Sequence, residues 1–344
     1  MIAITEHAIN SLYKKLRLLN IEQLDVSAYN KKYLSTYIKN YSFYMGLYKQ
    51  LLNKLLERLH KPVNETTFID YGGGCGILSY LAKEMGFKNV IYNDIYKVSA
   101  NDAKVISEAL KIKPDYFITG DIDEFISEIE RLNLKPDVIC SVDVLEHIYS
   151  WKLWIEKAMT LNDHFLLLFM TSANGANPFI KRKIKRIHLQ AEYKGFNKDK
   201  GWKDADLETA FFTERKKIIS TAFPELNKND VELLAQKSRG LMKNDIEKLT
   251  ADFIKTQKIN YHFAHPTNTC DPYTGNWSEN LIDINELKTF IESKHLKVDI
   301  TNALHSYSNS KIQNALKYVL NIAMKISGKH SLFFSPVYVL EIDK

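Results

Sequence analysis

Cysteine is scarce in this chain of 344 residues. The three cysteines, Cys75, Cys140 and Cys270, lie far apart, and no two of them form a Cys-x-x-Cys pair. A disulfide framework and a cysteine zinc site both need closely spaced thiols, so this spacing argues against each of them. Isolated cysteines are typical of a reducing compartment, and we expect a cytoplasmic protein.

Long hydrophobic runs and a strong charge imbalance are also absent. The longest strongly apolar run, residues 165–170, is far too short to span a bilayer, and Glu6 and His7 interrupt any apolar stretch near the start of the chain. We therefore expect no signal peptide and no membrane span, so that any membrane contact is peripheral. The net charge of +6 is too small to indicate nucleic-acid binding by itself.

The composition that remains is that of an ordinary folded, soluble protein. Hydrophobic residues make up 45% and charged residues 26% of the chain, which excludes disorder, collagen-like repeats and a coiled coil. At roughly 100 to 200 residues per domain, the length allows one large domain with additions or two domains.

The hydrophobic pattern changes along the chain and predicts an α/β fold. Residues 1–60 repeat apolar side chains at helical spacing, as Leu47, Leu51 and Leu55 do. Between residues 66 and 172, five short runs rich in Ile, Val, Phe or Tyr alternate with helical stretches, which indicates a parallel, doubly wound sheet. The runs are TFIDYG, VIYNDI, YFITGD, DVICSV and HFLLLFMTS.

The rest of the chain predicts an insertion and then a return to the sheet. After residue 176 the strand pattern gives way to a basic segment, three helices near 204–258 and a polar loop, which we interpret as a helical cap. Helices at about 284–295 and 309–327 and two more strands follow. The predicted domains are an N-terminal helical extension (1–60), a Rossmann-like core (61–175), the helical cap (176–280) and the C-terminal part of the core sheet (281–344).

The strongest functional signal is the run DYGGGCG at residues 70–76, which follows an apolar strand and opens a helix. Its glycines allow a sharp turn and let a ligand lie against bare backbone amides near a helix N-terminus. The spacing does not fit the dinucleotide fingerprint, because Ile77 or Ser79 stands where the third glycine belongs. No Gly-Lys-Ser/Thr follows, which excludes a P-loop. A ligand-free glycine turn is the alternative.

This run resembles motif I of the class I S-adenosylmethionine-dependent methyltransferases, and further motifs follow in the same order. Asp94 ends the second run, where the family has its ribose-binding acid, and Asp121 ends the third, where the family contacts adenine. Residues 136–147 are similar to the fourth-strand segment of the small-molecule branch, which includes the ubiquinone-type O-methyltransferases. The resemblance covers residues 61–175 well and residues 281–344 by the order of elements.

The resemblance implies a Rossmann-like sheet of seven strands in the order 3-2-1-4-5-7-6, with the last strand antiparallel, and S-adenosylmethionine as cofactor. Asp94 and Asp121 each have a simpler alternative reading, as the N-cap of a helix. The implied cofactor-binding residues are Asp70, Tyr71, Gly72, Gly73, Gly74, Gly76, Asp94, Ile95, Asp121, Ile122, Ser141 and Asp143.

Asp143, Glu146 and His147 are candidates for the chemistry, because their i, i+3, i+4 spacing places them on one face of a helix. His147 is the candidate catalytic residue, since imidazole titrates near neutral pH and could abstract a proton from a substrate hydroxyl. The two carboxylates with His147 could instead hold a divalent ion. The third alternative is that His147 hydrogen-bonds the fold and lines the pocket. We assign no metal site.

The most distinctive part of the helical cap is the polar loop, residues 265–277, with the sequence HPTNTCDPYTGNW. Its polar groups beside an aromatic ring would suit a polyhydroxylated ligand, and related enzymes place substrate-facing residues at this point. The alternative is a turn cluster whose groups hydrogen-bond one another. Cys270 is expected to be a packed thiol. The predicted substrate-binding residues are His265, Asn268, Asp271, Asn276 and Trp277.

The reading that unites these signals is a class I methyltransferase that transfers a methyl group to an oxygen, less readily a nitrogen, of a small-molecule or glycan acceptor. Two alternatives stay open. An RNA methyltransferase would use the one dense basic cluster, at residues 181–186, although a solvated helix face explains that cluster more simply and nucleic acid is not the expected partner. A catalytically silent cofactor-binding subunit would use its N-terminal helices as an interface. A homo-oligomer is compatible with the sequence.

Overall fold

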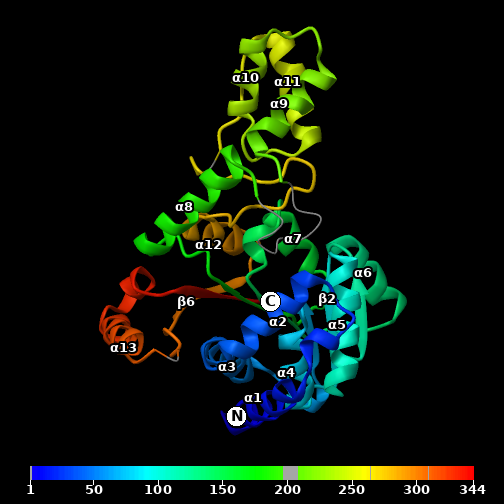
Figure 1. Ribbon diagram of the computed structural model, residues 1–344, viewed down its shortest axis with the longest axis vertical. Coiled ribbons are helices and arrows are strands. Elements are labelled where there is room, and N and C mark those ends of the chain that lie inside the picture. The colour runs from blue at the N-terminus through cyan, green and yellow to red at the C-terminus, as the bar shows by residue number, and fades with distance from the viewer. Residues whose placement is uncertain (1, 197–207, 264, 309) are drawn as a thin grey trace. The chain divides into compact units, whose positions relative to one another are not determined.

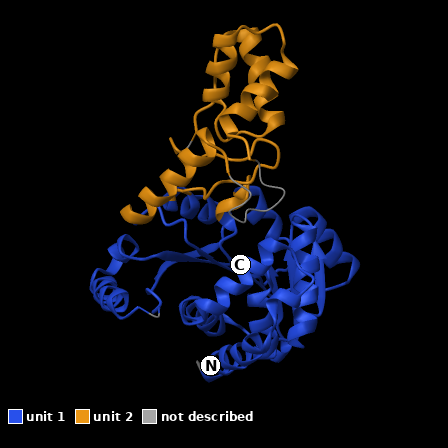
Figure 2. Cartoon of the chain, in the orientation of Figure 1, with its two compact units in different colours: residues 1–145, 152–177, 284–344 blue, residues 146–151, 178–283 orange. Residues whose placement is uncertain are grey.

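The computed structural model describes residues 2–196, 208–263, 265–308 and 310–344 (Figure 1). The chain divides into two units (Figure 2). The first unit contains residues 1–145, 152–177 and 284–344, and the second contains residues 146–151 and 178–283. Parts of two predicted helices, residues 204–207 and 309, lie outside the described residues.

A seven-stranded sheet forms the centre of the first unit, and its order is β3-β2-β1-β4-β5-β7-β6, as predicted. The first five strands pair in parallel, whereas β7 runs antiparallel to both β5 and β6. All seven predicted strands are confirmed. They are β1 (Thr67–Tyr71), β2 (Asn89–Asp94), β3 (Tyr116–Thr119), β4 (Val138–Val142), β5 (Leu166–Thr171), β6 (Lys297–Ala303) and β7 (Val337–Asp343).

The central strands β1 and β5 are buried along their whole length, because helices cover both faces of the sheet and shield residues of either orientation. The crossovers of the parallel part contain α4 (Ile77–Met85), α5 (Lys97–Leu110), α6 (Ile122–Arg131) and α7 (Trp151–Ala158). Because β1, β2, β3 and β4 are parallel and adjacent, the loops that leave their carboxyl ends meet at one edge of the sheet. The predicted cofactor residues lie on these loops or at the strand ends beside them.

The N-terminal helices belong to the first unit and share its core. They are α1 (Ile2–Leu18), α2 (Ala28–Lys39) and α3 (Tyr41–Arg58). Leu12 and Leu16 of α1 and Leu51 and Leu55 of α3 are fully buried or nearly so, in the same cluster as Leu81 of α4. Helical spacing of these leucines explains why this segment folds onto the sheet domain, since each helix alone would expose an apolar stripe to water.

The C-terminal part of the first unit contains α12 (Ile284–Ser293) before β6 and α13 (Lys311–Ile326) between β6 and β7 (Figure 1). In α12, Leu287 and Ile291 are one turn apart and fully buried. In α13 the buried residues are Asn321 and Met324, and most of the apolar side chains of that helix are exposed. Thus α12 buries apolar side chains, whereas α13 exposes most of its apolar side chains.

The second unit is helical in its described part. It contains α8 (Pro178–Tyr193), α9 (Phe211–Ala222), α10 (Lys228–Lys237) and α11 (Lys243–Thr256). Its small apolar core combines Ile219 of α9, Leu234 of α10 and Ile246 of α11, which are all fully buried. The three helices predicted near 204–258 correspond to α9, α10 and α11.

Candidate functional site

The glycine loop, residues 72–76, connects β1 to α4, and its glycines have two different structural roles. A Cβ atom on Gly72 would collide with Val144, and one on Gly76 would collide with Tyr80, so both positions need glycine for packing within the protein. Gly74 has a φ of +52° and no heavy atom within 4 Å of the place where its Cβ would be. Gly74 is therefore the point at which the backbone of the loop borders open space that a ligand could fill.

Asp94 holds this loop from the end of β2. Its Oδ2 atom accepts a hydrogen bond of 3.0 Å from the amide of Gly74, and its Oδ1 atom accepts one of 2.8 Å from the amide of Tyr96. Asp94 is not the N-cap of α5, because Tyr96 occupies that position. The structure thus joins the two motifs that the sequence places 20 residues apart, and it puts a carboxylate beside Gly74.

Asp70 has a supporting position beneath the same loop. Its Oδ2 atom accepts hydrogen bonds from the amide and the hydroxyl of Ser79, at 2.9 and 2.7 Å. Burial raises the pKa of the Asp70 carboxyl to about 7, and the nearby charge of Asp94 adds to the increase. The described contacts of Asp70 therefore anchor the start of α4, and Tyr71 beside it is packed against Trp154.

Asp121 is a helix N-cap, the simpler of its two readings. Its Oδ1 atom accepts from the amides of Asp123 and Glu124, and the Glu124 carboxylate accepts from the Asp121 amide, which completes a capping box. A capping role and a cofactor role are compatible, because the cap uses one carboxylate oxygen. Ile122 is buried, whereas Ile95 after β2 is 60% exposed, so Ile95 presents apolar surface beside Asp94.

The segment after β4 is not the helix face that we predicted for Asp143, Glu146 and His147. Asp143 has a φ of +53°, and its Oδ1 atom accepts a 2.7 Å hydrogen bond from the amide of Ser172. A short 3-10 turn, Leu145–His147, follows. The left-handed residue breaks any continuous helix, so the i, i+3, i+4 argument is wrong here. Ser141 donates to the carbonyl of Tyr71 at 2.8 Å and thereby ties β4 to the end of β1.

His147 is held by the polar loop within the second unit. Its Nδ1 atom lies 2.7 Å from the carbonyl oxygen of Trp277, and the Trp277 amide donates to the His147 carbonyl at 3.2 Å. A carbonyl oxygen can only accept, so Nδ1 carries the proton, and the neutral ring has its lone pair on Nε2. Nε2 lies 4.0 Å from a carboxylate oxygen of Glu279. This is the tautomer that a base acting through Nε2 requires.

The polar loop bonds largely to itself. The Oδ1 atom of Asp271 accepts from the amides of Tyr273 and Thr274, at 2.7 and 3.1 Å, as in an Asx turn. The side-chain amide of Asn268 donates to Asn280, and its Oδ1 accepts from the amide of Leu281. Asn268 and Asp271 are each 6% exposed. The internally hydrogen-bonded turn cluster describes Asp271, whereas Asn268 bonds residues just after the loop, and the substrate role of both remains a prediction.

The surroundings of the other predicted substrate residues are also set by the protein itself. The Trp277 ring stacks on Tyr149, with ring centroids 6.0 Å apart, and its indole N–H donates to the Tyr149 carbonyl. The backbone oxygen of Asn276 accepts from the Asp271 amide. Burial, helped by Lys181 and Lys185, lowers the pKa of His265. Cys270 is fully buried, as expected of a packed thiol.

The second unit contains a buried ion-pair network that the sequence analysis did not predict. Arg215 is fully buried and forms an ion pair with Glu192, and its Nε atom donates to the carbonyl of Ala235 at 2.8 Å. Glu192 also accepts from Thr269 of the polar loop at 2.7 Å. Arg239 donates to the carbonyls of Thr267 and Asn268. The polar loop therefore rests on charged side chains that lie 28 to 77 residues before the loop residues they bond.

Sequence reasoning also missed a tyrosine cluster, which we define as Tyr37, Tyr44 and Tyr48 of α2 and α3. The hydroxyls of Tyr37 and Tyr48 lie 2.9 Å apart, and the rings of Tyr37 and Tyr44 are 4.4 Å apart. Burial raises the pKa of all three, and the charge of Asp143 after β4 contributes in each case. The cluster therefore lies near the carboxyl end of β4. The missed signal is a tyrosine about once per helical turn, at positions 29, 33, 37, 41, 44 and 48.

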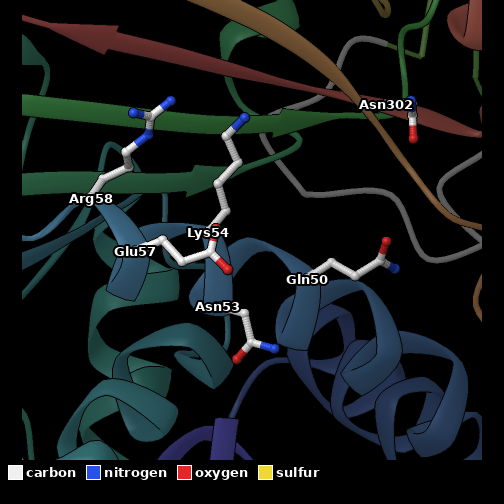
Figure 3. Close-up of a pocket in the computed structure, with 6 residues that line it drawn as sticks. All are labelled: Gln50, Asn53, Lys54, Glu57, Arg58 and Asn302. Carbon is white, nitrogen blue, oxygen red and sulfur yellow. The ribbon is translucent and has the colours of Figure 1, made fainter. Parts of the chain in front are cut away.

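A polar cavity of about 460 Å³ lies between α3 and β6 (Figure 3). Its cationic residues are already paired. Lys54 lies 3.2 Å from Asp299 and 3.3 Å from the buried Glu341 of β7, and Arg58 lies 2.7 Å from Glu341. These ion pairs attach α3 to the antiparallel part of the sheet, and we assign no ligand to the cavity. Its lining residues are Gln50, Asn53, Lys54, Glu57, Arg58 and Asn302.

Metal-binding clusters and membrane-spanning helices are both absent from the part of the chain that the structure describes. In the described ranges, no group of three or more His, Cys, Asp or Glu residues could hold a metal ion. None of the helices placed by the structure is both long enough and apolar enough to cross a bilayer. The basic residues at 181–186 lie on α8.

Comparisons with known proteins found one family model and several solved structures that are similar to this chain. A family model described as a methyltransferase domain matches residues 41–200. No curated protein matches the chain. The solved structure of the plantazolicin methyltransferase BpumL, in complex with a triazolic desmethylPZN analog and SAH, aligns with 98% of this chain and 98% of its own at 12% identity and a TM-score of 0.40. An S-adenosylmethionine-dependent methyltransferase from Clostridium acetobutylicum ATCC 824 aligns with 87% of this chain and 91% of its own at 11% identity and a TM-score of 0.42.

The family match and the parallel part of the sheet concern the same residues of the chain. Residues 41–200 contain α3, the glycine loop, Asp94 and the first five strands, and the complete sheet has the strand order expected for the class. This part of the chain is therefore similar to a methyltransferase domain, and its sheet is the one that the resemblance to the class I S-adenosylmethionine-dependent methyltransferases implies.

Proposed function

We propose that the chain transfers the methyl group of S-adenosylmethionine to an oxygen atom of a small-molecule or glycan acceptor. The observation that carries the proposal is the pairing of Gly74 with Asp94. Gly74 borders open space, and the carboxylate that bonds its amide stands at the end of β2. An open backbone beside an acid at this edge of a parallel sheet suits a ribonucleoside ligand.

The residues present fit the cofactor. Asp94 would accept hydrogen bonds from the ribose hydroxyls, Ile95 would offer apolar surface to a nucleobase, and the open space at Gly74 would admit the part of the ligand that follows. Bound S-adenosylmethionine supplies an electrophilic methyl group on a sulfonium centre. The chain's contribution is to hold and align the partners and to exclude water, which accounts for much of the acceleration of a transfer reaction.

The tyrosine cluster supports a small acceptor. Tyr37 and Tyr48 place two phenol hydroxyls in a buried setting near Asp143, and Tyr44 adds an aromatic face. Such a surface recognises a compact molecule that has both apolar and hydroxyl groups. We propose that the acceptor site is bounded by this cluster and by Asp143 after β4.

His147 is the proposed general base. Its Nδ1–H is fixed on the Trp277 carbonyl, which leaves Nε2 to take the proton of an acceptor hydroxyl. The carboxylate of Glu279, 4.0 Å from Nε2, would stabilise the imidazolium that forms.

The direct test of the proposed function is an unbiased search for the acceptor. The purified protein would be incubated with metabolite extract and isotope-labelled S-adenosylmethionine, and mass spectrometry would look for molecules that gain one labelled methyl group. We expect such a product to carry the label on oxygen. A label found in RNA, together with salt-sensitive RNA binding, would contradict the small-molecule proposal.

For the base, we predict that His147→Gln lowers kcat about a hundredfold or more and leaves the dissociation constant of the cofactor within a few fold. Glutamine keeps a donor for the Trp277 carbonyl but cannot take up a proton. The measurement is the pH profile of kcat, which should lose its acidic limb in the variant. A variant that keeps the limb and loses only acceptor affinity would make His147 a pocket wall.

A further inference from the structure

Helix α13 exposes a continuous row of apolar side chains. Ile312 is 86% exposed, Leu316 62%, Val319 60% and Ile326 81%, and Ile322 adds to the row at 42%. Steps of three or four residues place them on one face of the helix. Large exposed apolar surfaces of this kind usually mark an interaction site.

The helix is attached to the sheet unit through polar groups, so the apolar row is directed away from the protein. Asn321, on the buried side, donates to the carbonyl of His305 and accepts from its amide, at 3.0 and 2.7 Å. The Nζ atom of Lys317 lies 4.9 Å from the ring centroid of Phe43 in α3. An amphipathic helix that only covered a core would have the reverse orientation, with its leucine and isoleucines inside and its asparagine outside.

The segment that contains α13 carries charge of one sign. No aspartate or glutamate occurs between Asp299 and Glu341, whereas Lys311, Lys325 and Lys329 are exposed. Lys311 and Lys325 lie two heptads apart, on the same flank of the apolar row as the exposed Tyr318 between them. Long cationic side chains in this position can reach headgroups while their stems lie along the apolar boundary.

We propose that α13 is a peripheral docking helix for an anionic lipid surface. An apolar row flanked only by cations is the pattern of a helix that lies in the interface between headgroups and acyl chains. At about 1.5 Å per residue its 16 residues extend about 24 Å along the surface, a length suited to lying flat. A second copy of the chain fits less well, because its own α13 would bring more lysines and no carboxylate against the first.

The test is flotation of the full chain with vesicles, without cofactor or acceptor, so the result does not depend on the proposed methyl transfer. Vesicles of equal parts phosphatidylglycerol and phosphatidylcholine should bind the protein at least about tenfold more strongly than vesicles of phosphatidylcholine alone. Leu316→Glu should weaken that binding at least about tenfold. Leu18→Glu is the matched control, since Leu18 is an exposed leucine of α1, and it should change binding less than about twofold.

The charge is tested separately by the double variant Lys311→Gln and Lys325→Gln, which should lower binding to anionic vesicles about tenfold or more. Circular dichroism confirms that each variant is folded. Equal binding to both vesicle types, no binding of the original chain, or a dimer in sedimentation that Leu316→Glu dissociates would each overturn the proposal.

Discussion

The glycine loop of the first unit and the polar loop of the second were both predicted to bind ligands, yet they differ in where their polar groups point. In the glycine loop, Asp94 bonds the backbone at Gly74 and the adjoining space is open. In the polar loop, Asn268 and Asp271 bond their own neighbours, and Arg239 holds the backbone. The first loop borders open space at Gly74, whereas the second uses most of its polar groups for its own stability.

The difference teaches that polar composition alone does not indicate a binding site. The glycine loop follows a buried strand, so the parallel sheet fixes where a ligand of this loop would lie. The polar loop has no such frame, and its donors and acceptors can satisfy one another or buried partners such as Glu192. Substitutions in the second unit should therefore affect stability first, and those at the glycine loop should affect ligand affinity first.

The largest expected effect on stability comes from removing the ion pair that supports the polar loop. Arg215→Met leaves the Glu192 carboxylate buried without its main cationic partner, and we expect it to lower the free energy of unfolding by about 3 to 5 kcal/mol. Urea denaturation measures the change. Lys217→Met, on the same helix but exposed, is the matched control and should change stability by less than about 0.5 kcal/mol.

Both members of the Arg215–Glu192 ion pair can also be replaced in one variant. Glu192→Leu combined with Arg215→Met eliminates both charges, so the double variant should regain much of the lost stability. If Arg215→Met alone were harmless, the ion pair would not support the polar loop, and the contrast between the two loops would fail.

The next effect concerns ligand affinity at the glycine loop. Asp94→Ala removes the carboxylate that would bond the ribose and should cost about 2 to 4 kcal/mol of binding free energy for S-adenosylhomocysteine. Asp137→Ala is the control, because Asp137 precedes β4 at the opposite end of the sheet, where it bonds the Thr67 amide and Lys61. Calorimetry should find Asp137→Ala close to the original affinity. Equal affinities for the Asp94 variant and the original chain would remove Asp94 from the site.

A smaller effect, the pH dependence of local stability, should distinguish the two units. Burial raises the pKa of Asp70 to about 7, so the folded first unit holds a proton that the unfolded chain releases near pH 4, and this stability is lost as the pH rises towards 7. Burial lowers the pKa of His188 to about 4, so the unfolded second unit gains a proton below about pH 6.5, and stability is lost as the pH falls.

Between pH 7 and pH 5 these two groups should change local stability by roughly 2 kcal/mol in opposite directions. Hydrogen exchange measures each unit separately, after correction for intrinsic exchange rates. Amides of α4 should become better protected at pH 5, and amides of α8 should become less protected. Changes of the same sign in both helices would show that Asp70 and His188 do not control them.

The fold was predictable from the sequence because its signals are periodic. Apolar runs of strand length separated by helical stretches identified all seven strands, and the motif order behind the glycine loop supplied the strand order. The junction between β1 and α4 was placed correctly for the same reason, since a strand followed by closely spaced glycines has few alternative structures.

The rest of the site depends on contacts that spacing does not reveal. The interrupted helix after β4 follows from the left-handed backbone of Asp143, which no local residue pattern signalled. The ion pair of Arg215 with Glu192 joins residues on different helices. The tyrosine cluster becomes a candidate surface only because α2 and α3 pack near Asp143. Long-range pairs of this kind are determined by tertiary packing rather than by local sequence.

The central claim is that Gly74 faces the cofactor, and two glycine substitutions test it most directly. Gly74 and Gly86 both have left-handed backbones, with φ of +52° and +83°, and neither would bring a Cβ within 4 Å of another group, but Gly86 ends α4 at its far end. Valine should strain the backbone at both positions. Calorimetry with S-adenosylhomocysteine should show binding lost in Gly74→Val and preserved within about threefold in Gly86→Val. Equal affinity in the two folded variants, or binding of NAD in place of S-adenosylhomocysteine by the original chain, would contradict the account.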